Sequence, residues 1–236
     1  MTDKPAFGLM GYPIEHSLSP VLFRQAYSGK WDYDLIEEAE FGRAWERFIG
    51  HYQAVNVTAP YKCDAFRKAD FHSEECRRIG ACNILVKTDK GIEAHNSDCL
   101  AVKSLLAEQE IEDGTVLIIG NGGAGKAAAE AARSLGMDTV VCNRTANSAA
   151  GIRPLAEIPL LASVCDIVIY TLPCPIPEMD GVRCSILMEA NYRTPSYADG
   201  QAADKYIPGK EWLRRQAILG YGLMTGEAPD AEAMDI

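Results

Sequence analysis

The sequence contains no apolar stretch long enough to cross a bilayer, for which a helix needs about 20 consecutive apolar residues. Its most apolar tract, residues 158–177, is interrupted by Asp166 and several prolines. The first 20 residues also lack the basic start and apolar centre that define a signal peptide. We therefore expect a cytoplasmic protein that makes no contact with a membrane.

Basic residues are scarce as well. The chain has 23 Lys and Arg against 33 Asp and Glu, which gives a formal net charge of -10, and no basic block occurs anywhere. Proteins that bind nucleic acid or anionic lipid non-specifically use clustered Lys and Arg to neutralise phosphates. This composition excludes nucleic acid as an expected partner and favours a small molecule.

None of the eight cysteines is separated from another by two residues, the spacing that zinc knuckles and redox centres use. We expect free thiols, several of them buried, and no metal site. With 236 residues, 47% apolar and 24% charged, the chain is typical of a globular protein of one large or two small domains.

Strand-like and helix-like segments alternate along the chain, which predicts an α/β fold. Strands are expected at 6–12, 33–36, 54–57, 116–119, 139–142, 166–172 and 185–190, with a hairpin at 83–87 and 92–95. Helices are expected at 19–28, 41–49, 61–68, 73–79, 98–110, 126–135 and 210–224. Prolines and a glycine between 145 and 160 leave room for little regular helix.

A glycine-rich loop follows the strand expected at 116–119. Gly120, Gly122 and Gly125 fit the pattern Gly-x-Gly-x-x-Gly between a strand and a helix, where such a loop cradles the pyrophosphate of a dinucleotide. The other residues of the loop expected to bind the cofactor are Gly123 and Ala124. A P-loop is the competing interpretation, but Ala127 stands where that motif needs a Ser or Thr hydroxyl for magnesium. A purely structural glycine turn is the second alternative.

The end of the next strand indicates which dinucleotide is bound. Asn143-Arg144-Thr145 contains no acid to accept hydrogen bonds from a ribose 2'-hydroxyl, and Arg144 lies 24 residues after Gly120. A guanidinium matches a 2'-phosphate in charge and geometry. Arg144 could equally be a solvated surface residue, but together with the loop it favours NADP over NAD.

Four polar clusters lie at the expected ends of elements in the first half: His16-Ser17-Leu18-Ser19-Pro20, Asn56-Val57-Thr58-Ala59-Pro60-Tyr61-Lys62, Gly80-Ala81-Cys82-Asn83 and Asn96-Ser97-Asp98. Each residue has an ordinary structural explanation, as a helix cap, a turn residue or a surface lysine. In parallel sheets, however, the ligand crevice lies at the ends of strands. Hydroxyls, amides, one lysine and one aspartate are suited to a polyhydroxylated acid.

Taken together and in this order, these motifs resemble the shikimate dehydrogenase family over nearly the whole chain. That resemblance implies an α/β protein with an N-terminal α/β substrate domain, a Rossmann-like doubly wound nucleotide-binding domain and a cleft between them. The substrate domain would be residues 1–99, with a C-terminal helix 211–236 packing back on it. The NADP-binding domain would be residues 100–210.

The resemblance also implies the roles of individual residues. Lys62 and Asp98 would form the catalytic pair that reduces 3-dehydroshikimate to shikimate with NADPH, a step of aromatic amino-acid biosynthesis. Ser17 and Ser19 would bind the substrate carboxylate. The other implied substrate-binding residues are Thr58, Asn83, Tyr192 and Gln216, and Gly209 joins Asn143, Arg144 and Thr145 among those implied for the cofactor.

The chain departs from the family pattern at a few positions. Tyr170-Thr171-Leu172-Pro173 stands where Asn-Ala-Thr is usual, and Ser148 stands where a second basic residue is common. A quinate or aminoshikimate dehydrogenase of the same family is one alternative. A homologue that senses its ligand without catalysis is another. We expect a monomer or a homodimer.

Overall fold

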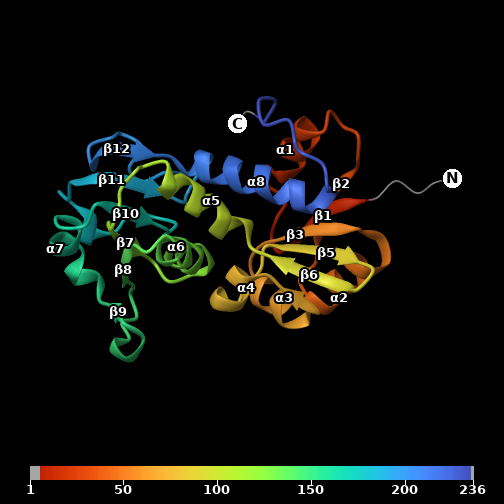
Figure 1. The fold of residues 1–236 in the computed structure, drawn as a ribbon, viewed down its shortest axis with the longest axis horizontal. Coiled ribbons are helices and arrows are strands. Elements are labelled where there is room, and N and C mark those ends of the chain that lie inside the picture. Colours follow the sequence, from red (N-terminus) through yellow and green to blue (C-terminus); the bar gives the residue numbers. More distant parts are fainter. Residues whose placement is uncertain (1–5, 235–236) are drawn as a thin grey trace. The chain divides into compact units, whose positions relative to one another are not determined.

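The computed structural model describes residues 6–234, which form two compact units (Figure 1). The first unit contains the described residues up to Ser97 and those from Arg214 onward, and the second contains Asp98–Leu213. Within the described residues no helix has the length and apolar character needed to span a membrane. Each unit is built on its own six-stranded sheet.

The sheet of the first unit has the strand order β2-β1-β3-β5-β6-β4. Its strands are β1 (Phe7–Gly11), β2 (Tyr33–Glu37), β3 (Ala54–Val57), β4 (Phe71–His72), β5 (Ile84–Thr88) and β6 (Gly91–His95). β1 runs parallel to β2 and β3, whereas β5 runs antiparallel to β3 and β6. The expected hairpin is therefore confirmed, and it makes this sheet mixed.

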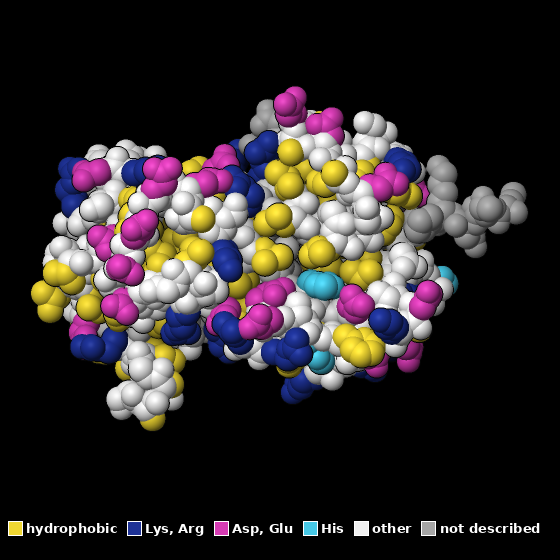
Figure 2. Space-filling view, in the orientation of Figure 1, with side chains coloured by type: hydrophobic (Ala, Val, Ile, Leu, Met, Phe, Trp, Pro, Cys, Tyr) yellow, Lys and Arg dark blue, Asp and Glu magenta, His cyan; other side chains and the backbone are white. Residues whose placement is uncertain are grey.

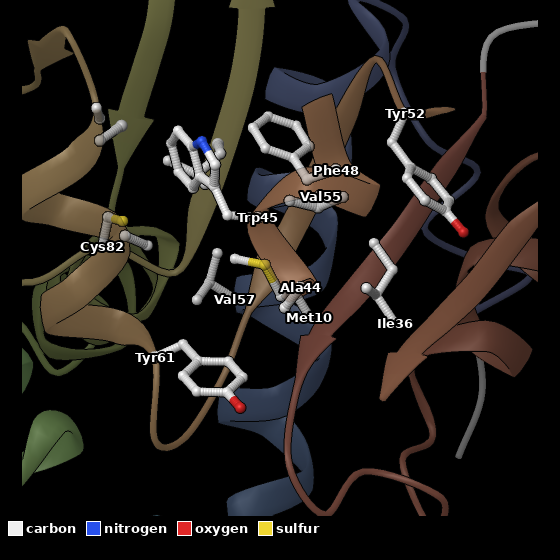
Figure 3. Close-up of a cluster of buried hydrophobic side chains, with 14 of the residues drawn as sticks. Met10, Ile36, Ala44, Trp45, Phe48, Tyr52, Val55, Val57, Tyr61 and Cys82 are labelled. Carbon is white, nitrogen blue, oxygen red and sulfur yellow. The ribbon is translucent and has the colours of Figure 1, made fainter. Parts of the chain in front are cut away.

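Four helices follow the first strands: α1 (Ser19–Ala26), α2 (Phe41–His51), α3 (Lys62–Lys68) and α4 (Glu74–Ile79). α2 illustrates why they pack, because Ala44, Trp45 and Phe48 form one buried face at helical spacing. Figure 3 shows Trp45 and Phe48 beside Met10 of β1 and Val55 of β3 in the core of this unit. Because β1 and β3 are anchored in this core, the loops that follow them begin from fixed positions.

The last helix, α8 (Gly209–Thr225), confirms the helix expected at 210–224, whereas the longer bound of 211–236 is wrong because the helix ends at Thr225. Gly226 has a φ of 72°, a left-handed conformation that ends the helix. The segment after the helix packs within the first unit, where the Asp230 N–H donates to the Ala26 carbonyl oxygen at 2.9 Å. Arg214 donates from Nε to the carbonyl oxygen of Met234 at 2.8 Å, and Met234 is fully buried. Residues 235 and 236 lie outside the described part of the chain.

The second unit has the strand order β12-β11-β10-β7-β8-β9, with every neighbouring pair parallel. Its strands are β7 (Thr115–Ile119), β8 (Asp138–Cys142), β9 (Ile152–Arg153), β10 (Ile167–Tyr170), β11 (Cys184–Glu189) and β12 (Ala203–Ile207). Renumbered from β7, the order is 6-5-4-1-2-3, the doubly wound arrangement of dinucleotide-binding domains. The expected Rossmann-like fold is confirmed.

The helical elements of the second unit are α5 (Ser97–Ala107), α6 (Gly123–Ser134), η1 (Ser148–Ala150), η2 (Leu155–Glu157), α7 (Ile158–Ala162) and η3 (Pro177–Met179). Between residues 145 and 160 the chain forms η1, the two-residue strand β9, η2 and only the first residues of α7, so little regular helix occurs there, as expected. Strand β12 was not expected, because Asp204 and Lys205 at its centre are exposed at the edge of the sheet and interrupt the apolar pattern.

The surface carries both signs of charge. Figure 2 shows acidic and basic side chains interspersed over the visible face of each unit, with no continuous basic area on that face. The polar side chains that are suited to binding or catalysis lie at the ends of the strands.

Candidate active site

Ser17 lies in the segment that leads from β1 into α1, and Ser19 is the first residue of α1. Ser17 donates from its hydroxyl to the Ser19 hydroxyl at 3.1 Å, and the Ser19 backbone N–H donates to Ser17 Oγ at 3.2 Å. The structure thus brings the two predicted carboxylate-binding residues together. Their short side chains form one hydroxyl pair held by the local backbone.

Two tyrosines lie next to this pair, of which Tyr221 is buried and Tyr33 half-buried. The Tyr221 hydroxyl of α8 donates to the Ser19 carbonyl oxygen at 3.0 Å, and the Tyr33 hydroxyl of β2 donates to Asn56 Oδ1 at 2.7 Å. Burial raises the pKa of both phenols well above their usual value, so both stay neutral. The sequence motifs did not reveal these tyrosines. They pack beside the two serines as uncharged groups.

Thr58 lies directly after β3 and next to the end of β1. Its backbone N–H donates to the Met10 carbonyl oxygen at 2.9 Å, and its carbonyl accepts from Tyr61 at 3.0 Å. A Cβ at Gly11 would come within 2.4 Å of Thr58 Cγ2, so only glycine allows this approach. Gly11 is therefore a site-building residue that the sequence motifs did not reveal.

Lys62 is the first residue of α3. Its carbonyl oxygen accepts from the Cys82 N–H at 3.1 Å, which ties the start of the helix to the loop that carries Asn83. Burial raises the pKa of the Cys82 thiol, and the Lys62 charge opposes that rise. Burial outweighs the Lys62 charge, so the Cys82 thiol stays protonated.

Asn83 and Gln216 are linked through Ser97. Asn83, 4% exposed, donates from Nδ2 to Ser97 Oγ at 3.0 Å and accepts the Ser97 N–H at 2.7 Å. Ser97 donates in turn to Gln216 Oε1 at 3.2 Å. Residues from three distant parts of the sequence thus form one polar network. Ser97 was part of a recognised motif but had no role assigned to it.

Asp98 begins the second unit, in the first turn of α5, and is the residue that follows Ser97 along the chain. Its side chain is half-buried. Because Lys62 belongs to the first unit and Asp98 to the second, the expected meeting of the two side chains stays a prediction.

The glycine turn after β7 has the conformation that its sequence predicts. Gly120 has a φ of 106°, and a Cβ at Gly125 would lie 2.1 Å from the Gly120 carbonyl oxygen. At Gly122, by contrast, no protein atom lies within 4 Å of a built Cβ. Gly120 and Gly125 must be glycine because of the backbone conformation and packing of the turn. The open space beside Gly122 fits a closely approaching pyrophosphate.

α6 begins at Gly123, three residues before the expected start. Gly123, Ala124 and Gly125 therefore form its first turn, whose backbone N–H groups have no intrahelical acceptors. Free N–H groups and the helix dipole favour an anion at this point. The residues present fit a dinucleotide phosphate.

Thr171 and Leu172 support the turn from β10, the strand next to β7. Thr171 donates from Oγ1 to the Ile119 carbonyl oxygen at 2.8 Å, immediately before Gly120. A Cβ at Gly120 would meet Thr171 Oγ1 at 2.4 Å and Leu172 Cδ2 at 3.0 Å. The segment that departs from the family pattern thus packs directly on the nucleotide loop, where the strand order reverses.

Arg144 extends from the end of β8 and is exposed. Its neighbour Asn143 donates from its backbone N–H to the Arg153 carbonyl oxygen at 3.0 Å and from Nδ2 to the Thr145 carbonyl oxygen at 3.4 Å. The Arg153 guanidinium itself pairs with Glu157. The hydrogen bonds of Asn143 therefore fix the backbone that carries Arg144 and Thr145. This is the end of β8 where the 2'-phosphate is expected.

Tyr192 and Gly209 are also brought together within the second unit. A Cβ at Gly209 would lie 2.8 Å from the Tyr192 backbone nitrogen, so glycine is needed where α8 begins. The Tyr192 ring lies 5.9 Å from the Arg193 guanidinium carbon. These contacts give Gly209 a packing role beside Tyr192.

Comparisons with known proteins identify the family. Residues 9–85 match the family described as the shikimate dehydrogenase substrate binding domain, and residues 77–178 match the NAD binding domain of D-isomer specific 2-hydroxyacid dehydrogenases. A shikimate dehydrogenase (NADP(+)) of Thermus thermophilus is 34% identical over 254 residues, 97% of this chain and 95% of the relative. That of Pyrococcus abyssi is 31% identical over 253 residues, with the same coverage of both chains. The chain belongs to the shikimate dehydrogenase family.

A solved family structure has the same fold throughout. The shikimate 5-dehydrogenase from another strain of Thermus thermophilus, crystallised with NADP(H) and shikimate, superposes with a TM-score of 0.82 at 25% identity. The match covers 98% of this chain and 97% of that one. Among residues 6–234, no cluster of three or more metal-ligating side chains occurs.

Proposed function

We propose that this protein is an NADP-dependent shikimate dehydrogenase, which reduces 3-dehydroshikimate to shikimate with NADPH and catalyses the reverse oxidation. The observation that carries this proposal is the similarity, at 34% and 31% identity and over 97% of the chain, to enzymes of that name. Two features support it: the glycine turn of the second unit, which suits a dinucleotide, and the polar network of the first unit, which suits a hydroxylated substrate. We also propose that it works in the cytoplasm, which is consistent with eight free cysteines.

The substrate site is proposed to be assembled mainly from the first unit. The Ser17 and Ser19 hydroxyls would donate to the carboxylate, and Thr58, Asn83 and Gln216 would bond the ring hydroxyls. Tyr192 of the second unit would complete this set. No arginine belongs to it, so selectivity would rest on shape and on paired hydroxyls. A ligand that lacks one hydroxyl would leave a protein group unpaired, at a cost of about 1–3 kcal/mol.

Lys62 is proposed to stabilise the oxygen on which negative charge develops during reduction, and to exchange a proton with it. A cation beside that oxygen lowers the energy of the transition state more than that of the ground state. Asp98 would orient the ammonium and accept a hydrogen bond from a neighbouring hydroxyl. Bound NADPH supplies the hydride.

The cofactor is proposed to bind along the ends of β7 and β8. The first turn of α6 would hold the pyrophosphate, with Gly122 leaving room for it. Asn143, Arg144 and Thr145 would contact the adenosine ribose and its 2'-phosphate. The segment around Gly209 would complete the cofactor-binding set.

A spectrophotometric screen tests the proposal. Purified protein is assayed at about 340 nm, where reduced nicotinamide absorbs, with shikimate and with quinate, each against NADP and NAD. We expect the highest kcat/KM for shikimate with NADP. A preference for quinate, or binding of shikimate without hydride transfer to either cofactor, would contradict the assignment and favour a quinate dehydrogenase or a ligand-sensing homologue.

A further inference from the structure

The hydroxyl of Ser97 connects two polar side chains of the first unit, Asn83 and Gln216. Ser97 is 0% exposed, accepts from Asn83 Nδ2 at 3.0 Å and donates to Gln216 Oε1 at 3.2 Å. Its backbone N–H donates to Asn83 Oδ1 at 2.7 Å. Asn83 is therefore bonded to Ser97 twice, once through each end of its amide.

The backbone N–H sets the direction of every bond in this chain. An N–H can only donate, so the atom of Asn83 that faces it must be the oxygen, and the amide nitrogen must be the atom that donates to the Ser97 hydroxyl. A hydroxyl has one hydrogen, which Ser97 then directs to Gln216. The Gln216 oxygen is thereby fixed toward Ser97, and its nitrogen lies at the other end of the amide.

Close packing keeps this arrangement from relaxing. A Cβ at Gly220 would lie 3.0 Å from Ser97 Oγ and 2.8 Å from Ile84 Cδ1, so α8 approaches the serine as closely as a glycine allows. Asn83 and Ser97 are both buried. In such surroundings a reversed amide would place two donors or two acceptors face to face, without solvent to compensate.

We propose that Ser97 is a positioning residue that makes the outward end of Gln216 a hydrogen-bond donor, and so selects a substrate with an oxygen there. This inference rests on the proposed role of Gln216 in the site. A hydroxyl or carbonyl oxygen offers the lone pairs that an amide N–H needs. An ammonium offers only hydrogens, so the network favours oxygen-substituted rings of the shikimate class over amino-substituted ones.

The first experiment removes the hydroxyl. Steady-state kinetics of Ser97→Ala are measured with shikimate and aminoshikimate, at saturating NADP. Because the Gln216 amide can then rotate, we expect the KM for shikimate to rise about tenfold with kcat within about threefold. We also expect the preference for shikimate over aminoshikimate to fall about tenfold. Ser134→Ala, which removes a hydroxyl bonded only to the Ala131 carbonyl oxygen, is the matched control.

The second experiment replaces the hydrogen-bond donor of the Gln216 side chain with an acceptor. In Gln216→Glu, Ser97 still donates to one carboxylate oxygen, and the other becomes an acceptor that suits an ammonium. We expect the ratio of kcat/KM for aminoshikimate to that for shikimate to rise about 100-fold. A purely structural role of Ser97 predicts no such reversal. If Ser97→Ala does not fold, Ser97→Cys, of similar size and with a weaker donor, takes its place and should show a smaller change in the same direction.

Wild-type KM and preference in Ser97→Ala, or an unchanged preference in Gln216→Glu, would overturn the proposal. Failure of the proposed function gives a different result, because the wild-type protein itself would then show no turnover of shikimate with NADP. In that case the affinities of the same variants for shikimate and aminoshikimate, measured by calorimetry, decide the role of Ser97 separately.

Discussion

Lys62 is the residue on which the proposed chemistry depends most. Lys62→Ala removes the cation and the proton donor, and general acid-base groups typically contribute about 100 to 10,000-fold to a rate. We expect kcat to fall within that range, whereas the KM for NADP should stay close to the wild-type value because the cofactor would be held by the second unit. The measurement is shikimate oxidation followed by absorbance.

The matched control is Lys90→Ala, since Lys90 is an exposed lysine in the turn between β5 and β6. It should retain wild-type turnover. Lys62→Ala with an undiminished kcat would show that another group stabilises the developing charge.

Arg144 carries the second prediction at this scale. If its guanidinium pairs with the 2'-phosphate, Arg144→Ala loses a charge-assisted hydrogen bond of about 1.5–3 kcal/mol, and the KM for NADP should rise about 10 to 100-fold. The KM for NAD should change little. Initial rates with both cofactors make the comparison, and Arg133→Ala, which alters an exposed arginine in the last turn of α6, is the control. Equal effects on both cofactors would remove the 2'-phosphate role.

Single residues also show how far the sequence leads. The motifs named Asn83 and Gln216 as separate contacts, but the serine that links them was recognised only as a member of Asn96-Ser97-Asp98, without a role of its own. Gly11 is similar, since only the close approach of Thr58 makes glycine necessary there. A motif identifies the groups suited to a ligand, whereas the residues that orient those groups depend on contacts distant in sequence.

Among the elements, the loop after β11 depends on one buried carboxylate. Glu189 is 0% exposed and accepts from Ser196 N at 2.6 Å, Tyr197 N at 3.3 Å and the Tyr206 hydroxyl at 2.7 Å. Three donors converge on it, and they close the segment that contains Tyr192. Burial raises the pKa of Tyr206, so this phenol stays a donor.

Glu189→Gln is therefore expected to disturb that loop. A Gln amide turns one acceptor into a donor that faces another donor, which costs about 1–3 kcal/mol. We expect a lower urea midpoint and a raised KM for shikimate, with the KM for NADP changed less. The control is Asp204→Asn on the neighbouring β12, whose exposed pair with Arg183 should contribute little. An unchanged KM in a destabilised Glu189→Gln would separate the loop from substrate binding.

The elements themselves were largely predictable. Strands β7, β8, β10 and β11 lie within about two residues of their expected positions, because buried parallel strands are short apolar runs between turns. Strands β4, β9 and β12 were missed, since two are very short and one is exposed at an edge. Their pairing is supplied by neighbouring strands, so their own sequence contains little signal.

At the scale of the whole molecule, buried thiols predict how stability changes with pH. Burial raises the pKa of Cys76 to about 12 and those of Cys142 and Cys184 to about 11, from an ordinary value of 9.0. Above that value the unfolded chain loses these protons while the folded protein keeps them. The contribution of these thiols to the free energy of unfolding should therefore be constant well below pH 9 and decrease as the pH rises toward 11.

Urea midpoints at about pH 7.5 and about pH 10 test this expectation. Cys142→Ala should lower the midpoint at neutral pH and show a smaller decline between the two pH values. Cys63→Ala, which changes an exposed cysteine, should decline as the wild-type protein does. A decline that is the same in all three proteins would assign alkaline destabilisation to other groups, such as Tyr33 and Tyr221, whose pKa values are also raised.

The sequence by itself determined the α/β class, the glycine turn and the identity of the polar groups, because each follows from local periodicity or from a short motif with its own steric logic. The pairing of β5 against β3 and the network through Ser97 were decided only in the tertiary structure. The physical reason is that a hydrogen bond or a close approach between distant segments depends on both partners. The sequence of one segment therefore does not reveal which partner it will contact.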